Sequence, residues 1–252
     1  MRTVLQKAVC LSIFSAAALL GLDANATLLL SGDVGGANPF CVTDQASCTQ
    51  SGTTLDDVDA GLGGFVVPTF GVANVVVNGL QATATIAGTT NTLAFLIGSV
   101  VNQNTTPVTI SITVSSIGFS APVSLTTRSG SGTWTNANGS SATLTWYIDP
   151  ANTQGAGTVN GRPGTLLQTF TDAAVGASDS FSHSSSGAVA VTTPFSMTLG
   201  LDLTLAAGGT LSNFGQSEIA ALVNGTQIPE PVSFALIALG LLGLAYTRTK
   251  HR

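Results

Sequence analysis

The sequence predicts an all-β protein: an antiparallel β-sandwich, with the jelly roll as one form of it, between an N-terminal signal helix and a C-terminal transmembrane helix. Apolar residues alternate with small or polar ones in many short runs, which is the pattern of strands with one buried face. Turn-forming residues separate these runs, and long helical patterns are absent outside the two ends of the chain. Many short strands with frequent turns are typical of sandwiches.

The N-terminal residues 1–26 have the parts of a secretory signal peptide. A basic start is followed by an apolar stretch, and the stretch ends in the small-residue pattern Ala24-Asn25-Ala26. We expect signal peptidase to cleave after Ala26 and to leave Thr27 as the first residue of the mature chain. An uncleaved N-terminal anchor is the alternative.

Residues 27–227 are the predicted extracytoplasmic domain, and they are numerous enough for one sizeable core. This part of the chain holds ten acidic side chains, two arginines, one histidine and no lysine, which gives a net charge of about −8. Phosphate binding requires clustered Lys and Arg, so nucleic acid is excluded as a partner. The surface is expected to consist mainly of Thr, Ser, Asn and Gly, as in an extracellular structural protein.

Cys41 and Cys48 are the two cysteines that remain after signal cleavage. In an oxidising compartment we expect them to form a disulfide, which would add about 2–3 kcal/mol of stability. A metal or redox site is the alternative, but neither a nearby histidine nor a C-x-x-C pattern supports it.

The strand pattern is clearest at residues 195–205, where every odd position is large and apolar, and it recurs at residues 108–114. Shorter candidate strands are residues 72–80, 82–87, 92–97, 123–127, 165–171 and 178–183. Residues 31–64 are predicted to be irregular or at an edge, and residues 149–164 to form a long loop. Residues 216–222 are the one candidate for a short helix in the body.

Asn-Gly pairs at residues 78–79 and 138–139 predict two-residue hairpin turns. The second turn would place Trp134 beside Tyr147 on an exposed, hydroxyl-rich face of the hairpin. The opposite, buried face would consist of Ala142, Leu144, Trp146 and Ile148. Exposed aromatic rings can stack on sugars, so Trp134 and Tyr147 are a candidate glycan platform. A covering second sheet, or a register shift by one residue, would bury this face instead.

The search for catalytic or metal-binding groups gives little. Asp56, Asp57 and Asp59 are a candidate calcium site, with a solvated turn as the alternative, and their spacing fits no EF-hand. His183 is the only histidine of the body, and no nucleophile or phosphate-binding motif is present. We therefore expect neither an enzyme nor a cofactor, although scattered carboxylates leave a hydrolase as an alternative.

The C-terminal residues 228–252 have three parts: Pro229-Glu230-Pro231, an apolar run and a basic end. The prolines keep the short motif extended. The fifteen uncharged residues after the motif would span about 22 Å as a helix, against about 30 Å for a bilayer core. With one interfacial residue added, the expected transmembrane helix is 232–247. The basic end belongs on the cytoplasmic side.

This tail resembles the PEP-CTERM sorting signal of Gram-negative bacteria in the order of its three parts. The resemblance implies that an exosortase recognises Pro229, Glu230 and Pro231 and removes the tail. It also implies transient residence in the inner membrane, then release or attachment at the cell surface, often alongside exopolysaccharide production. An ordinary single-pass anchor is the alternative.

Taken together, these features predict an exported, non-enzymatic cell-surface or extracellular-matrix protein associated with the envelope or its exopolysaccharide. A carbohydrate-binding or adhesive β-sandwich module is the alternative. A hydrolase built on a β-sandwich is the second alternative.

Overall fold

The computed structural model describes residues 27–221 apart from residues 45–47, 49–51 and 60. The chain divides into two units, Met1–Leu222 and Val223–Arg252, and every described residue lies in the first. The predicted signal peptide, the Pro229-Glu230-Pro231 motif and the predicted transmembrane helix all lie outside the described residues. Within the described part, no helix has the length and apolar character needed to cross a membrane.

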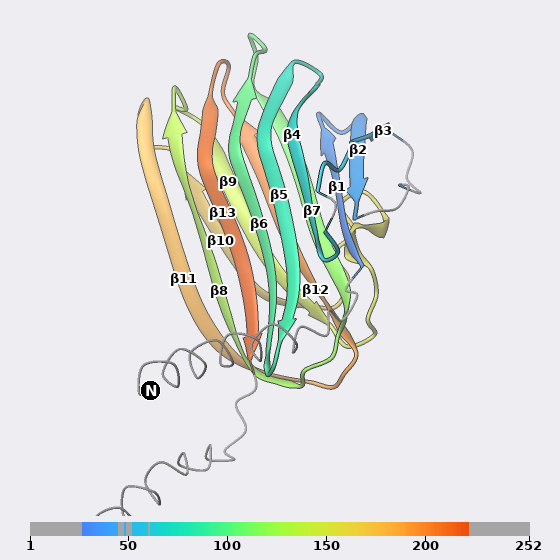
Figure 1. The fold of residues 1–252 in the computed structure, drawn as a ribbon. Coiled ribbons are helices and arrows are strands. Elements are labelled where there is room, and N and C mark those ends of the chain that lie inside the picture. The colour runs from blue at the N-terminus through green and yellow to red at the C-terminus, as the bar shows by residue number, and fades with distance from the viewer. Residues whose placement is uncertain (1–26, 45–47, 49–51, 60, 222–252) are drawn as a thin grey trace, which may run out of the picture. The chain divides into compact units, whose positions relative to one another are not determined.

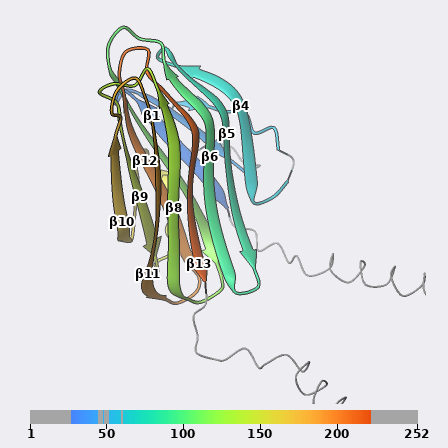
Figure 2. The ribbon, with the colours of Figure 1, turned by 90° about the vertical axis from the view of Figure 1, so that its left-hand side faces the viewer.

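The described residues form two β-sheets that lie face to face (Figures 1 and 2). The seven-stranded sheet has the order β10-β9-β12-β7-β1-β2-β3. Its strands are β1 (Leu28–Val34), β2 (Asn38–Thr43), β3 (Thr53–Thr54), β7 (Val108–Phe119), β9 (Ser141–Asp149), β10 (Thr165–Ala173) and β12 (Phe195–Leu205). All its pairs are antiparallel except the short pair of β2 with β3.

The six-stranded sheet has the order β11-β8-β13-β6-β5-β4 and is antiparallel throughout. Its strands are β4 (Gly64–Val72), β5 (Val75–Ala87), β6 (Thr90–Asn102), β8 (Val123–Thr135), β11 (Ser178–Val191) and β13 (Thr210–Ala221). The prediction of an antiparallel β-sandwich is confirmed. The only other regular element is the short 3-10 helix η1 (Gly155–Gly157) within the described residues.

The core lies between the sheets because alternate residues of each strand point inward. Trp134 of β8 and Trp146 of β9 are both fully buried, one from each sheet. The predicted buried face of β9 is confirmed, since Ala142, Leu144, Trp146 and Ile148 are at most 1% exposed.

Strand β12 has the bounds that its alternation predicts, but its second face is solvated only in part. Ser196 and Thr198 point away from the core and are still buried. The loop between β9 and β10 covers this part of the outer face, and a Cβ at its Gly155 would lie 2.5 Å from the Thr198 hydroxyl.

Both predicted hairpin turns are wrong. Strands β8 and β9, on either side of Asn138-Gly139, belong to different sheets, so the connection crosses the sandwich instead of closing a hairpin. Asn78-Gly79 lies inside β5. The turn between β4 and β5 falls at Ala73-Asn74, where φ is 48° and 59°. Two successive positive φ values are the requirement of the tight hairpin turn.

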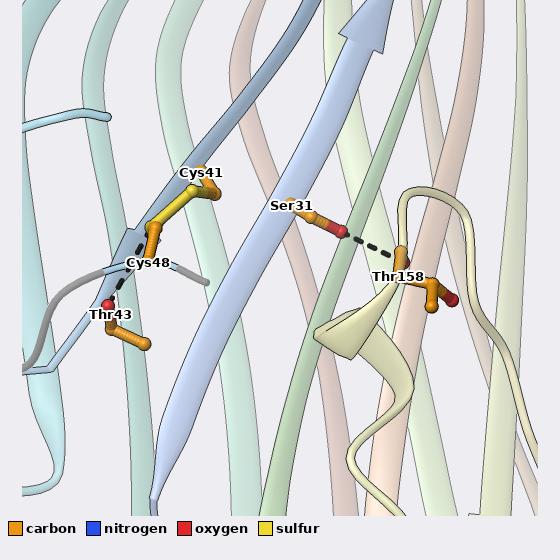
Figure 3. The surroundings of a disulfide bond; sticks show 5 residues. All are labelled: Ser31, Cys41, Thr43, Cys48 and Thr158. Atoms are coloured by element: carbon orange, nitrogen blue, oxygen red, sulfur yellow. Dashed lines mark hydrogen bonds between the residues drawn. A yellow bond between two sulfur atoms is a disulfide. The ribbon is translucent and has the colours of Figure 1, made fainter. Parts of the chain in front are cut away.

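Two further expectations are corrected. Residues 31–64 are not simply irregular, because β1 is buried along its whole length between β7 and β2. Residues 216–221 continue β13 and are not a helix, because they pair with both β6 and β8. The predicted disulfide between Cys41 and Cys48 is present, and it ties the end of β2 to the following segment (Figure 3).

Candidate functional site

The outer face of the seven-stranded sheet carries a row of polar side chains that crosses four strands. Thr143 of β9 pairs with Asp202 of β12, Asp202 pairs with Ser111 of β7, and Ser111 pairs with Asp33 of β1. Residues that pair directly across strands have side chains on the same face. The registers therefore bring two carboxylates and two hydroxyls into one line.

The loop between β9 and β10, residues 150–164, crosses this outer face beside the polar row; we call it the strap. The N–H of Ala156 donates to Ser115 Oγ on β7 at 2.8 Å, and Gln154 Nε2 donates to the Ser115 carbonyl oxygen at 2.8 Å. Ser31 Oγ of β1 donates to the carbonyl oxygen of Thr158 at 3.4 Å (Figure 3). These bonds hold the strap against the sheet.

Arg162 extends from the strap to Asp202 and makes two parallel hydrogen bonds with it. Nη1 donates to Asp202 Oδ2 at 2.6 Å, and Nη2 donates to Oδ1 at 2.7 Å. Ser111 Oγ also donates to Oδ1, at 2.6 Å. These two parallel bonds hold the carboxylate in one orientation, and the positive charge of the guanidinium stabilises its ionised form.

A glycine on β12 makes room for the arginine. A Cβ at Gly200 would lie 2.5 Å from the guanidinium carbon of Arg162 and 2.4 Å from the Thr145 hydroxyl. Arg162 Nε donates to Thr113 Oγ1 at 3.3 Å, on the neighbouring strand β7. The arginine is therefore laid flat over the sheet, with its polar end directed at the polar row.

Asp202 is ionised and partly open to solvent. Partial burial by itself would raise the pKa of Asp202, but the hydrogen bonds from Arg162 and Ser111 and the arginine's charge outweigh it and lower this pKa. The Asp202 side chain is 47% exposed, whereas the Arg162 side chain is 13% exposed. The carboxylate thus presents accepting oxygen to solvent while its partner is mostly covered.

Asp202 lies at a depression of about 280 Å³, which we call the Asp202 groove. Its lining residues are Asp33, Gly36, Thr109, Ile110, Ser111, Ser141, Thr143, Asn160, Asp202, Leu203 and Thr204. Asp33 is 7% exposed, and its carboxylate accepts a hydrogen bond from the N–H of Gly36. Hydroxyls, two carboxylates and one amide therefore make up the polar lining.

The outer face of the six-stranded sheet has two further depressions, of about 310 and 550 Å³. They share Ser129, Ser184 and Ser217. Serine is the commonest residue in their lining, and no carboxylate is among the lining residues. This face offers mainly hydroxyls, and Arg128 is the one lining residue with a permanent charge.

The candidate glycan platform of Trp134 and Tyr147 is wrong. Trp134 has no exposed surface, and its Nε1 donates to Asp172 Oδ2 at 2.7 Å. Tyr147 pairs with Thr198 and lies on the other sheet, pointing outward. The hairpin that would have joined the two rings does not exist, because β8 and β9 belong to separate sheets.

The acidic cluster is bonded to its own backbone. Asp57 Oδ1 accepts from the N–H groups of Asp59 and Val66 at 2.9 and 3.0 Å, and Asp59 Oδ1 accepts from the N–H of Gly61 at 3.0 Å. The described residues contain no group of three or more His, Cys, Asp or Glu side chains able to hold a metal ion. The candidate calcium site at Asp56, Asp57 and Asp59 gains no support.

His183 lies on β11 in an aromatic and amide environment. Its Nε2 is 2.7 Å from Gln168 Nε2, and its ring stacks on Phe170 with centroids 4.3 Å apart. No carboxylate or nucleophile is bonded to the ring among the described residues. This histidine lacks the partners of a catalytic base.

The sequence did not reveal the Asp202 groove. Asp202 was visible as a charged residue on the polar side of an alternating strand, and Arg162 was one of only two arginines in the body. Neither signal shows that a loop would lay the arginine over that strand. The partnership depends on the path of the strap, which local patterns do not determine.

No protein-family model matches the chain, and no curated protein matches it. Similar solved structures include a carbohydrate-binding module, TmCBM61, in complex with β-1,4-galactotriose, which is 11% identical to this chain. The match covers 50% of this chain and 69% of that module, with a TM-score of 0.29. A chain from the structure of infectious bursal disease virus, Gx strain, is 13% identical. The match covers 83% of this chain and 53% of the viral chain, with a TM-score of 0.34. A carbohydrate-binding module from the lichenase 5A of Cellvibrio mixtus, in complex with cellotriose, is 15% identical to this chain. The match covers 58% of this chain and 89% of that module, with a TM-score of 0.22. No function follows from similarities this distant.

Proposed function

We propose that this chain is an exported, non-catalytic β-sandwich protein that binds neutral carbohydrate in the Asp202 groove. The observation that carries the proposal is the Asp202 carboxylate, half exposed, held by Arg162 and Ser111, and surrounded by hydroxyls. Sugar hydroxyls are hydrogen-bond donors, and a bond from a hydroxyl to a fixed carboxylate is stronger than one between neutral groups, about 1.5–3 kcal/mol.

The charges of the groove favour a neutral ligand. Asp33 and Asp202 supply two negative charges, and the single guanidinium of Arg162 is already bonded to Asp202. An anionic ligand would meet the net negative charge without a free cation to compensate it. The neutral hydroxyls of the rest of the lining can both donate to and accept from a sugar.

The protonation state of Asp202 does not suit the proton donor of a glycosidase. A carboxyl-dependent glycosidase needs one carboxylic acid whose pKa is raised, so that it can protonate the leaving oxygen. The pKa of Asp202 is lowered instead, so this group is a poor proton donor.

The test is binding of the exported protein to an array of neutral glycans. We expect binding by the wild type, and an affinity about tenfold or more lower in Asp202→Asn, because the substitution replaces a charged acceptor by a neutral one. Ser129→Ala, on the outer face of the other sheet, is the matched control and should bind normally. Absence of binding to any glycan, or equal binding by Asp202→Asn, would rule the proposal out.

We further propose that the chain reaches the cell surface by the route that its termini indicate. Signal peptidase would remove residues 1–26, and an exosortase would act at Pro229-Glu230-Pro231 during transient residence in the inner membrane. The disulfide between Cys41 and Cys48 supports an oxidising destination. Exopolysaccharide is then the carbohydrate that the groove would meet first.

A further inference from the structure

The two sheets have four edge strands, and three of them are poorly suited to pairing with another strand. β3 has two residues, β4 carries Pro68, and the pairing of β10 shifts in register between Leu166 and Gln168. Short length, proline and irregular register are the usual ways in which edge strands avoid unwanted pairing. The fourth edge, β11, pairs with β8 in unbroken register from Ser178 to Ala188.

The β11 edge lacks the charges that usually protect such strands. Ser180–Val191 contains no Asp, Glu, Lys, Arg or Pro. The side chains that point to the outer face, Ser182, Ser184, Ser186 and Ala188, are small and exposed. Asp179 binds the N–H of Ser180 at 2.8 Å and so occupies one amide at the start of the edge.

Hydrogen bonds indicate which backbone groups of β11 point away from the sheet. The carbonyl oxygen of Gly187 accepts from Thr126 Oγ1 of β8 at 3.3 Å, so Gly187 faces β8. Successive residues of an antiparallel strand alternate between their two neighbours. Even-numbered residues from Ser182 to Ala188 therefore present N–H and C=O groups to the open side.

We propose that β11 is a homodimerisation edge, which pairs antiparallel with β11 of a second copy about a two-fold axis at Ser184. This axis places Ser184 opposite its own copy and Ser182 opposite Ser186, so small hydroxyl side chains meet along the seam. A C2 interface requires such self-complementarity. Two copies share the same net negative charge, and the part of β11 from Ser180 to Val191 carries no acidic side chain.

The test is sedimentation velocity of the full exported chain over a wide range of concentration. The wild type is expected to double in mass with concentration. Ser182→Lys/Ser186→Lys places like charges opposite each other and should raise the dissociation constant about tenfold or more. Ser182→Lys/Ser186→Glu places opposite charges across the same seam and should recover association.

Two controls separate pairing from folding. Ser184→Pro removes an outward N–H but no bond to β8, so far-UV circular dichroism should be unchanged while association is lost. Thr169→Lys, on the exposed face of β10, should associate like the wild type. A wild type that stays monomeric, a Lys/Lys variant that associates normally, or a Lys/Glu variant no better than Lys/Lys would each overturn the proposal.

Discussion

Glu218 is a carboxyl group that β13 places in the core of the sandwich. It has no exposed surface, and both carboxyl oxygens lack a hydrogen-bond partner among the described residues. Arg128 lies directly opposite on β8, but its Nη1 donates to the carbonyl oxygen of Leu167 at 3.1 Å. Burial raises the pKa of Glu218 well above its usual range, and attraction to Arg128 only partly offsets this.

The raised pKa of Glu218 predicts a stability that declines with rising pH. The folded state holds this proton more tightly than the unfolded chain, so its contribution is complete below the ordinary pKa of 4.5. That contribution is lost as pH rises through the higher pKa of the folded state. Glu218→Gln should remove this part of the pH dependence, as measured by denaturant unfolding at a series of pH values. Identical pH profiles for the two proteins would contradict the assignment.

The strap shows how an irregular element can position a functional side chain. It has one short helical turn and is held to the sheet through Ser31, Ser115 and Arg162. Two of the close contacts involve glycine: Gly155 lies against Thr198, and Gly200 lies under Arg162. The first contact fixes the strap, and the second fixes the arginine.

Gly200→Ala should separate the binding geometry from the stability of the fold. The new methyl group would meet the guanidinium of Arg162, which lies at the end of a long side chain and can shift, and the Thr145 hydroxyl. Displacing Arg162 removes the bonds that lower the pKa of Asp202, so NMR titration should show that pKa to be higher. Carbohydrate affinity should fall with it.

Gly155→Ala provides the comparison for this variant. Its methyl group would lie 2.9 Å or less from two atoms of Thr198 and 3.1 Å from a backbone oxygen of the strap. We expect it to loosen the strap itself, seen as faster hydrogen exchange over residues 150–164. If Gly200→Ala left the pKa of Asp202 unchanged, Arg162 would not be the group that sets it.

Strand pattern and strand partnership differ in how far the sequence determines them. Alternation is a local property, and it predicts the bounds of β12 and the buried face of β9. Asn138-Gly139 does mark a change of direction, but a turn signal does not specify whether the next strand pairs or crosses to the other sheet. That choice depends on the packing of the whole sandwich. Because the chain crosses to the other sheet here, Trp134 is buried in the core instead of lying beside Tyr147.

The same limit explains why the Asp202 groove was not predicted. Asp33, Ser111 and Asp202 come from strands far apart in the chain, and only the sheet order brings them into one row. Arg162 reaches that row through tertiary contacts of the strap. The local sequence predicts which face of a strand a residue lies on, but it does not predict which residue lies opposite on the neighbouring strand.

At the scale of the whole molecule, the two sheets have different outer faces. The seven-stranded sheet carries the Asp202 groove with its two carboxylates, and the six-stranded sheet carries depressions rich in serine and the β11 edge, which has no acidic or basic residue from Ser180 to Val191 other than His183. The proposed dimer would join two six-stranded sheets edge to edge and leave both Asp202 grooves outside the seam. Two grooves on one dimer could engage the same polysaccharide chain, which raises avidity without new contacts.

The signal peptide and the sorting motif predicted at the two ends of the chain predict the mass of the mature protein. The described sandwich, with its core, lies within residues 27–221, so removal of the two terminal segments is expected to leave its packing unchanged. We expect the intact mass of the protein from its native host to correspond to a chain that starts at Thr27 and ends near Pro229 to Pro231. In a strain without the exosortase, the tail through Arg252 should remain while the signal peptide is still removed. A mass that retains Arg252 in both strains would make the tail a plain membrane anchor, and carbohydrate binding would then occur at the membrane surface rather than in the extracellular matrix.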